Sequence, residues 1–233
     1  MAAVGVLFIP GFMQPASAWA PVAERLDPPA TLLNHREHSF EGRLAEIAAA
    51  GAQALLVGYS LGGRLALRGA LRDPSRYAGL VTVGVMAGIE DQAERSARAE
   101  ADERLASWIE AAPIEDVVAI WERQPLFADQ SEPLVEQQRP GRLAQDPAAL
   151  ARLLRSAGQG VLEPVWHELL TFQLPMLAVA GARDEGYVSA AQKLAGAAPN
   201  ARAQIVEHAG HAPQLQQPDE LASIIAAFRE SLS

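Results

Sequence analysis

The chain has 233 residues, of which 49% are hydrophobic and 20% charged, and it contains no cysteine. A chain of this length can bury a sizeable core, as one or two domains. The absence of cysteine excludes disulfide scaffolds, thiolate zinc sites and a cysteine nucleophile. The formal charge of −9 argues against a general binder of nucleic acid or membrane surfaces, because such binders need a cationic surface.

The N-terminal residues carry no recognisable targeting signal. Residues 1–10 lack a basic segment, and their apolar run is too short for a signal peptide. No apolar stretch approaches the roughly 20 residues that a membrane span needs. We therefore expect a cytoplasmic protein without membrane attachment.

Short apolar runs alternate with helical patterns along most of the chain. Residues 4–9 are continuously apolar and stop at Pro10, which is typical of a strand buried on both faces. The other expected strands are 31–33, 54–59, 80–86, 176–180 and 204–206. The expected helices between them are 17–26, 40–50, 61–71, 188–197 and 219–232. This alternation predicts an α/β fold with a mostly parallel central sheet and helices on both faces.

The alternation stops between residues 88 and 167. This stretch contains no convincing strand, and prolines separate its helical patterns. The expected helices are 91–111, 114–122, 132–138 and 147–156. We expect residues 88–167 to form a helical cap inserted into a core of residues 1–87 and 168–233, and not an independent domain.

A G-x-S-x-G motif, Gly58-Tyr59-Ser60-Leu61-Gly62, lies where an expected strand meets an expected helix. Strand, sharp turn and helix form the context of a nucleophile elbow, which exposes the serine at the carboxyl edge of the sheet. We predict Ser60 as the nucleophile; the alternative is a glycine-rich packing turn. The amide of Leu61 opens the helix and can stabilise an oxyanion. Phe12, after the first strand, is the expected second donor unless that loop is a plain turn.

A serine needs a base and an orienting acid to become a nucleophile. Asp184 follows the strand expected over 176–180, and His211 follows the last expected strand, so both reach the edge that carries Ser60. We predict these three residues as a catalytic triad. Glu185 and His208 are the alternatives for the acid and the base.

The remaining histidines predict no metal site. The five histidines of the chain show no ligand spacing on a credible helix, and no dinucleotide fingerprint is present. We expect neither a metal nor a cofactor. His35 and His38 are expected in a surface loop, and His167 is expected to be structural or adjacent to substrate.

The order Ser60, Asp184, His211 identifies the chain as a member of the α/β-hydrolase superfamily over essentially its whole length. The chain also resembles a narrower family, the MenH-like 2-succinyl-6-hydroxy-2,4-cyclohexadiene-1-carboxylate synthases of menaquinone biosynthesis. The segments that carry this resemblance are 58–64 (GYSLGGR), 121–128 (WERQPLFA), 154–156 (LRS) with Gly158 and Gly160, Trp166, and 181–184 (GARD).

The resemblance implies a lyase that eliminates pyruvate from an enolpyruvyl cyclohexene carboxylate without hydrolysing an ester. In that family the triad histidine removes a proton from the succinyl arm in concert with the serine, and the oxyanion hole holds the enolate-like oxygen. The implied partner is a small carboxylated substrate, and the sequence predicts no oligomeric state. A carboxylesterase or thioesterase with the same triad is the alternative, and a non-catalytic binding protein is a third.

The resemblance also implies residues that bind the substrate. Arg64, Arg98 and Arg155 would hold carboxylates, for which arginine is the natural bidentate partner. Tyr59 and Trp121 would line the pocket. The alternatives are an exposed Arg64, an ordinary helix pair between Arg98 and Asp102, and a packing role for Trp121.

The chain departs from the family pattern at three places. Pro10 stands where the family commonly has histidine, and residues 34–38 (NHREH) lack its Gly-His-Gly. Gln214 stands where a second histidine often follows the triad histidine. These departures favour either a divergent member or a relative with a different substrate.

Overall fold

The fold is built on a six-stranded sheet, seen in a computed structural model that describes residues 4–28 and 30–232. The strands are β1 (Val6–Ile9), β2 (Thr31–Leu32), β3 (Leu55–Tyr59), β4 (Gly79–Val83), β5 (Met176–Gly181) and β6 (Ala201–Val206). Their order is β2-β1-β3-β4-β5-β6, and every neighbouring pair is parallel. The predicted parallel sheet is confirmed.

The largest differences from the predicted strand bounds, three residues each, are in β4 and β6. β4 ends at Val83 instead of residue 86, because Gly84 turns the chain with a φ of 63°. β6 begins at Ala201 instead of residue 204, and its exposed side chains alternate as expected for an edge strand. The sequence of β6 is therefore not a continuous apolar run, which explains why its first three residues were missed.

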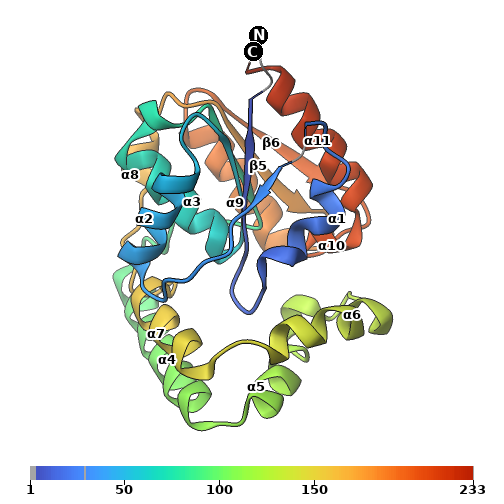
Figure 1. The fold of residues 1–233 in the computed structure, drawn as a ribbon. Coiled ribbons are helices and arrows are strands. Elements are labelled where there is room, and N and C mark those ends of the chain that lie inside the picture. The colour runs from blue at the N-terminus through green and yellow to red at the C-terminus, as the bar shows by residue number, and fades with distance from the viewer. Residues whose placement is uncertain (1–3, 29, 233) are drawn as a thin grey trace.

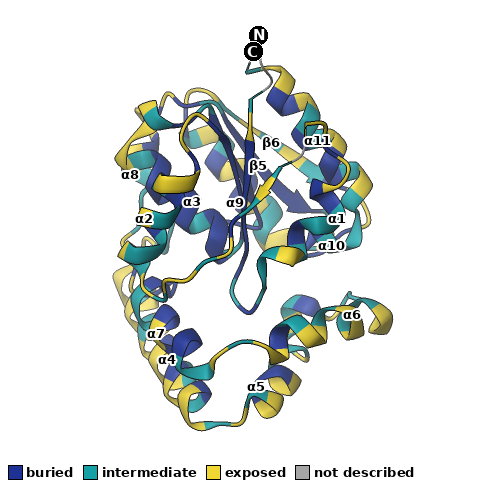
Figure 2. Ribbon diagram, viewed as in Figure 1, coloured by how far each residue is buried: buried dark blue, intermediate teal, exposed yellow. Residues whose placement is uncertain are grey.

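Helices cover both faces of the sheet (Figure 1). One face carries α2 (Phe40–Ala50), α3 (Leu61–Arg72) and α9 (Glu185–Ala197), and the other carries α1 (Ala20–Ala23) and α11 (Pro218–Glu230). Short helices complete the core: η1 (Ala16–Trp19), η2 (Pro74–Arg76), α8 (Trp166–Leu169) and α10 (Pro213–Gln216). The four central strands, β1, β3, β4 and β5, are entirely buried between the two helical layers (Figure 2).

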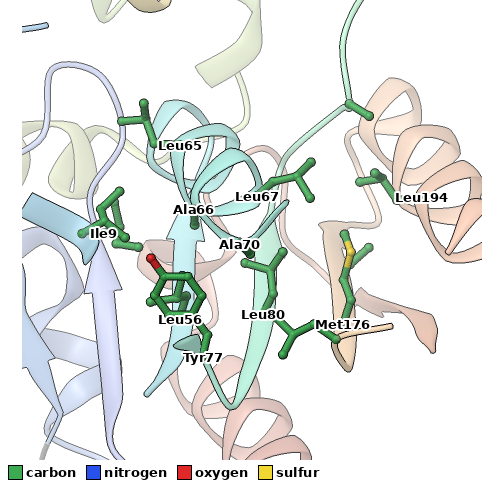
Figure 3. Packing of buried hydrophobic residues seen from close by; sticks show 14 of the residues in the cluster. Ile9, Leu56, Leu65, Ala66, Leu67, Ala70, Tyr77, Leu80, Met176 and Leu194 are labelled. Carbon is green, nitrogen blue, oxygen red and sulfur yellow. The ribbon is translucent and has the colours of Figure 1, made fainter. Parts of the chain in front are cut away.

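Helix α3 packs closely on the central strands of the sheet. Ala66 and Ala70 of α3 lie beside Leu56 of β3 and Leu80 of β4 (Figure 3), and all four side chains are fully buried. Small residues on this face of α3 let the helix approach the sheet closely. The N-terminus of α3 therefore meets the carboxyl end of β3.

The expected helix over residues 17–26 is instead a 3-10 turn, η1, followed by the single-turn α1. Pro21 lies in the first turn of α1 and has no amide hydrogen to extend the hydrogen-bond pattern of η1. Trp19 is fully buried there, and its indole N–H donates to the Ile9 carbonyl over 3.1 Å.

Between β4 and β5 the described chain contains helices and no strand. Before α8, these are α4 (Gln92–Ala111), α5 (Ile114–Trp121), η3 (Pro125–Phe127), α6 (Glu132–Leu143) and α7 (Pro147–Ala157). Figure 1 shows α4 to α7 as an arc beyond one edge of the sheet. The expected boundary at residue 167 falls within α8, which belongs to the core through buried Leu169. From here on, the cap means residues 88–164.

The cap has a small apolar core of its own, and it is seated on the loop after β1. Ile109, Val117 and Leu150 are buried together with Met13, which comes from that loop. At the base of the cap, the Val165 amide donates to the Ala87 carbonyl over 2.8 Å. Within residues 4–28 and 30–232, no helix is both long and apolar enough to cross a membrane.

Candidate active site

Ser60 occupies a sharp turn between β3 and α3, with a φ of 49° and a ψ of −114°. This left-handed backbone costs about 1–3 kcal/mol for a residue other than glycine and persists only where the surrounding structure holds it. A Cβ atom at Gly62 would overlap the carbonyl oxygens of Ile9 and Pro10. Glycine at this position therefore lets the turn press against the end of β1, and Ser60 faces a cavity at the sheet edge.

Asp184 and His211 meet at the same edge, at the ends of β5 and β6. The His211 Nδ1–H donates to Asp184 Oδ2 over 2.8 Å, and the His211 side chain is only 1% exposed. His211 Nε2 has no hydrogen-bond partner among the described residues, so it is free to accept a proton. Glu185 and His208 are exposed, and neither lines the cavity that holds Ser60 and His211.

Aromatic side chains and one glycine set the plane of the His211 ring. The ring centroid lies 4.5 Å from that of Tyr187 and 5.3 Å from that of Tyr59. A Cβ atom at Gly84 would come within 3.0 Å of His211 Cε1. Burial raises the pKa of both the Tyr59 and Tyr187 hydroxyls, so each stays protonated and can donate a hydrogen bond.

The sequence prediction missed Tyr187, because the helix was expected to begin at residue 188. α9 begins at Glu185, so Tyr187 lies in its first turn, just after Asp184. Its ring therefore lines the cavity next to His211.

The cavity has a volume of about 190 Å³ and lies between the sheet edge and the cap. The core lines it with Phe12, Tyr59, Ser60, Leu61, Arg64, Tyr187 and His211, and the cap with Arg98, Trp121 and Arg142 among others. The amide of Leu61 opens α3, where first-turn N–H groups have no partner within the helix. Phe12 and Leu61 both line the cavity that holds Ser60.

Arg64 and Arg98 both reach the cavity, as the resemblance implies. Arg64 donates through Nη1 to the Ala157 carbonyl over 3.2 Å. Burial lowers the pKa of Arg64 to about 10, so the guanidinium stays charged at neutral pH. Arg98 donates through Nε to Asp102 Oδ1 over 2.7 Å and through Nη1 to Gln159 Oε1 over 3.0 Å. Arg98 thus lines the cavity and also forms the helix pair that was its alternative interpretation.

The prediction for Arg155 is corrected by its position. Arg155 does not line the cavity, and it pairs with Glu103 over 3.0 Å and Glu110 over 2.8 Å on the outside of α4. The preceding residue, Leu154, lines the cavity. Because consecutive helical residues point about 100° apart, Arg155 faces away from it.

Arg142 is a cavity arginine that the sequence prediction missed. It is 3% exposed and pairs through Nη1 with Glu122 Oε1 over 3.0 Å, while Glu122 is itself 7% exposed. Its guanidinium carbon lies 5.9 Å from the centroid of the Phe127 ring. The helix expected over 132–138 runs through Pro140 to Leu143, and this extension brings Arg142 to the cavity.

Trp121 lines the cavity and also packs as a wall residue. Its ring centroid lies 5.3 Å from that of Phe12 and 5.6 Å from that of Phe127. It therefore joins the cap to the loop after β1, so both interpretations of Trp121 describe its position.

The remaining histidines lie outside this cavity. The expectation of a surface position is wrong for His35, whose side chain is 3% exposed and whose Nδ1 lies 2.7 Å from Glu46 Oε2. Burial lowers the pKa of His35 to about 4. His167 belongs to α8, and His38 lines a separate cleft near β2. Within the described residues, no group of three His, Cys, Asp or Glu side chains could hold a metal ion.

Two of the three departures from the family pattern, Pro10 and Gln214, lie at buried positions. The carbonyl of Pro10 lies against Gly62, so this position contributes its backbone to the elbow. Gln214 is fully buried, and neither of its amide atoms has a hydrogen-bond partner in the described part of the chain.

The chain is similar to known proteins in both sequence and fold. The model of the Alpha/beta hydrolase family matches residues 6–224. A Bacillus subtilis protein provisionally named as a 2-succinyl-6-hydroxy-2,4-cyclohexadiene-1-carboxylate synthase is 33% identical over 76% of this chain and 66% of its own length. A synthase of the same name from Enterobacter is 30% identical over 73% of this chain and 64% of its own. The alignments thus span slightly less than two thirds of these relatives.

A solved structure is similar over nearly the whole chain. The structure of MenH from S. aureus superposes with a TM-score of 0.87 at 25% identity, over 98% of this chain and 94% of that one. A thermophilic esterase from Thermogutta terrifontis has a TM-score of 0.77 at 18% identity, over 99% of this chain and 91% of that one, a likeness of fold alone.

Proposed function

Because the chain belongs to the alpha/beta hydrolase family, we propose that it is a lyase that eliminates pyruvate from an enolpyruvyl cyclohexene carboxylate in menaquinone biosynthesis. The observation that carries this proposal is the cavity in which Ser60 and His211 face three arginines, Arg64, Arg98 and Arg142. A substrate with several carboxylates matches such a set of cations. The names of the similar synthases support the same reaction.

In this proposal His211 is the base and acts with Ser60. A proton leaves the carbon beside the succinyl carbonyl and passes through Ser60 Oγ to His211 Nε2, the ring nitrogen without a partner. Asp184 accepts the Nδ1–H over 2.8 Å, which fixes the tautomer and stabilises the imidazolium that forms.

The electrons of the broken C–H bond form an enolate. The amides of Phe12 and Leu61 would stabilise its oxygen, because both residues border the cavity beside Ser60. When the carbonyl re-forms, the electron pair of the enolate forms a new carbon–carbon double bond in the ring system, and the bond between the ring carbon and the enolpyruvyl oxygen breaks. The leaving group takes up a proton and departs as pyruvate, so the reaction needs neither water nor a redox cofactor.

The three arginines would hold the substrate while this elimination proceeds. Asp102 and Glu122 lie behind Arg98 and Arg142 and orient their guanidinium groups. Leu105 and Trp121 line the same cavity and would contact the carbon ring. The net charge of −9 thus accompanies a cavity that is locally cationic.

The test is the release of pyruvate from freshly prepared enolpyruvyl precursor, followed with lactate dehydrogenase and NADH. We expect one pyruvate for each precursor consumed. Short- and long-chain nitrophenyl esters serve as the comparison, because an esterase or thioesterase with the same triad would turn them over steadily. Steady ester hydrolysis without pyruvate release would contradict the proposal and favour the hydrolase.

A further inference from the structure

Asp129, in the cap, lies against the loop that carries His211. Asp129 follows η3, and Gln216 ends α10, just after that loop. Gln216 donates through Nε2 to Asp129 Oδ2 over 2.8 Å, and the Gly210 amide donates to Gln216 Oε1 over 2.9 Å. The Gln216 side chain thus joins the cap to the residue that precedes His211.

The loop lies so close to the cap at Gly210 that no side chain fits there. A Cβ atom at Gly210 would overlap all three carboxyl atoms of Asp129. On the core side, a Cβ atom at Gly181 would overlap the carbonyl oxygens of Ala209 and Gly210. The backbone just before His211 is therefore held between the end of β5 and a carboxylate of the cap.

The same loop contains a strained residue. His208 has a φ of 60°, in the left-handed region that favours glycine. Backbone of this kind persists only where neighbouring contacts hold it in place. The loop before His211 therefore depends on contacts from outside it, and Asp129 of the cap and Gln216 of α10 provide them at Gly210.

Only one orientation of the Gln216 amide satisfies both neighbours. A carboxylate such as Asp129 can only accept, and the Gly210 N–H can only donate. Gln216 must therefore turn its NH₂ group to Asp129 and its carbonyl to Gly210. A carboxylate at position 216 would still accept from Gly210 but would repel Asp129.

We propose that Asp129 and Gln216 are positioning residues that hold His211 beside Ser60 while the cap is seated on the core. The inference rests on the proposed roles of Ser60 and His211, and is independent of the substrate's identity. The cap also carries Arg98 and Arg142, so movement of the cap would displace these arginines and release the His211 loop together. Cap closure would then assemble the base and the carboxylate contacts in one step.

The test uses the rate at which a small uncharged fluorophosphonate modifies Ser60, because this reaction needs His211 but no carboxylate contact. Gln216→Glu places two carboxylates together, and we expect the rate to fall about tenfold or more. Asp129→Asn alone keeps an acceptor for the Gln216 amide, and we expect a change of less than about twofold.

The double variant Asp129→Asn with Gln216→Glu distinguishes positioning from mere destabilisation. The introduced amide can donate to the introduced carboxylate, which still accepts from Gly210, so we expect recovery to within about threefold of wild type. Gln204→Glu adds the same charge at an exposed position of β6 and should leave the rate unchanged. The unfolding temperature of each variant is measured alongside.

A folded Gln216→Glu variant that reacts at the wild-type rate would overturn the inference, and so would a double variant that shows no recovery. If Gln216→Glu does not fold, Asp129→Ala takes its place, and an unchanged rate for that variant overturns the inference instead. Wild-type protein that is phosphonylated at Ser60 but releases no pyruvate would count against the proposed substrate, and leaves the positioning test intact.

Discussion

The sheet edge and the cap hold their functional side chains in different ways. On the sheet edge, Ser60, Asp184 and His211 each follow a strand, and tight backbone contacts at Gly62 and Gly181 fix where the strands end. In the cap, Arg98 and Arg142 lie on helices and are oriented by buried carboxylates. Backbone contacts thus place the strand ends that carry Ser60, Asp184 and His211, with side chains adjusting His211, whereas the cap arginines depend on side-chain partners alone.

This difference suggests a division of labour between the two regions. Backbone contacts hold the triad to the small tolerances that proton transfer requires. A cavity wall built from ion pairs can change its residues without disturbing the strands, because loops and insertions on a rigid scaffold vary more freely. We therefore expect changes on the sheet edge to affect kcat, and changes in the arginines to affect KM.

Ser60→Ala is the change with the largest expected effect. It removes the hydroxyl that joins the substrate to His211, and we expect kcat for pyruvate release to fall about 10⁴-fold or more. Circular dichroism should show an unchanged fold. If the Ser60→Ala variant keeps a tenth of the wild-type kcat, Ser60 is not the residue that transfers the proton.

His35 offers a test of a titratable contact at the sheet edge. Its folded pKa of about 4 lies below the ordinary value of 6.5, so the unfolded chain binds the extra proton between these pH values. Stability from this group is present above about pH 6.5 and is lost as the pH falls towards 4, by about 3 kcal/mol.

Urea unfolding of wild type and of His35→Gln between pH 4 and 7 measures this contribution. We expect a smaller loss of stability at low pH in the variant, and His38→Gln, in the same loop, serves as the control. Identical pH dependence in wild type and His35→Gln would show that burial of the His35 ring does not lower its pKa enough to affect stability.

Arg64→Met tests the one cavity arginine that the core supplies. Loss of a charged hydrogen-bond donor to the substrate should raise KM about 10–100-fold while kcat changes little. Arg68→Met is the matched control, because Arg68 lies one turn further along α3, outside the cavity, and donates to the Glu163 carbonyl. Equal effects of the two substitutions on KM would contradict a substrate contact for Arg64.

Tyr187→Phe removes a single hydroxyl beside the triad. The protonated hydroxyl borders the cavity with Arg64 and Arg98, and we expect kcat/KM to fall about 3–10-fold. Tyr77→Phe, at a buried tyrosine of the core, controls for the loss of a hydroxyl. Steady-state kinetics that match wild type would exclude a role for the Tyr187 hydroxyl.

Arg155→Ala has the smallest expected effect. Its ion pairs with Glu103 and Glu110 lie on the outside of α4, away from the cavity. We expect KM for the precursor to change less than about twofold, because exposed ion pairs contribute little. A tenfold rise in KM would instead indicate that Arg155 contacts the substrate.

The triad could be predicted from the sequence because its signals are local. Ser60 lies in a motif that joins a strand to a helix, Asp184 follows an apolar run, and His211 follows a weaker strand signal at 204–206. Strand ends of a parallel sheet meet at one edge, so local patterns were sufficient to bring these three residues together.

The arginines were harder to predict, because their direction depends on how the cap helices pack. Arg155 is adjacent in sequence to a cavity residue, Leu154, yet points away from it. Arg142 lies beyond Pro140, where a proline was expected to have ended the helix. Which residue faces the cavity is therefore set by the packing of α6 and α7, which local sequence does not encode.

The most direct test of this division compares the kinetics of pyruvate release by His211→Ala and Arg142→Met with those of wild type. We expect the His211 variant to lose kcat about 10⁴-fold with little change in KM. We expect the Arg142 variant to raise KM about 10–100-fold and to keep kcat within about tenfold of wild type. If both variants lose kcat and neither changes KM, the account is contradicted. The cap arginine would then take part in the chemistry and would not serve to bind the substrate.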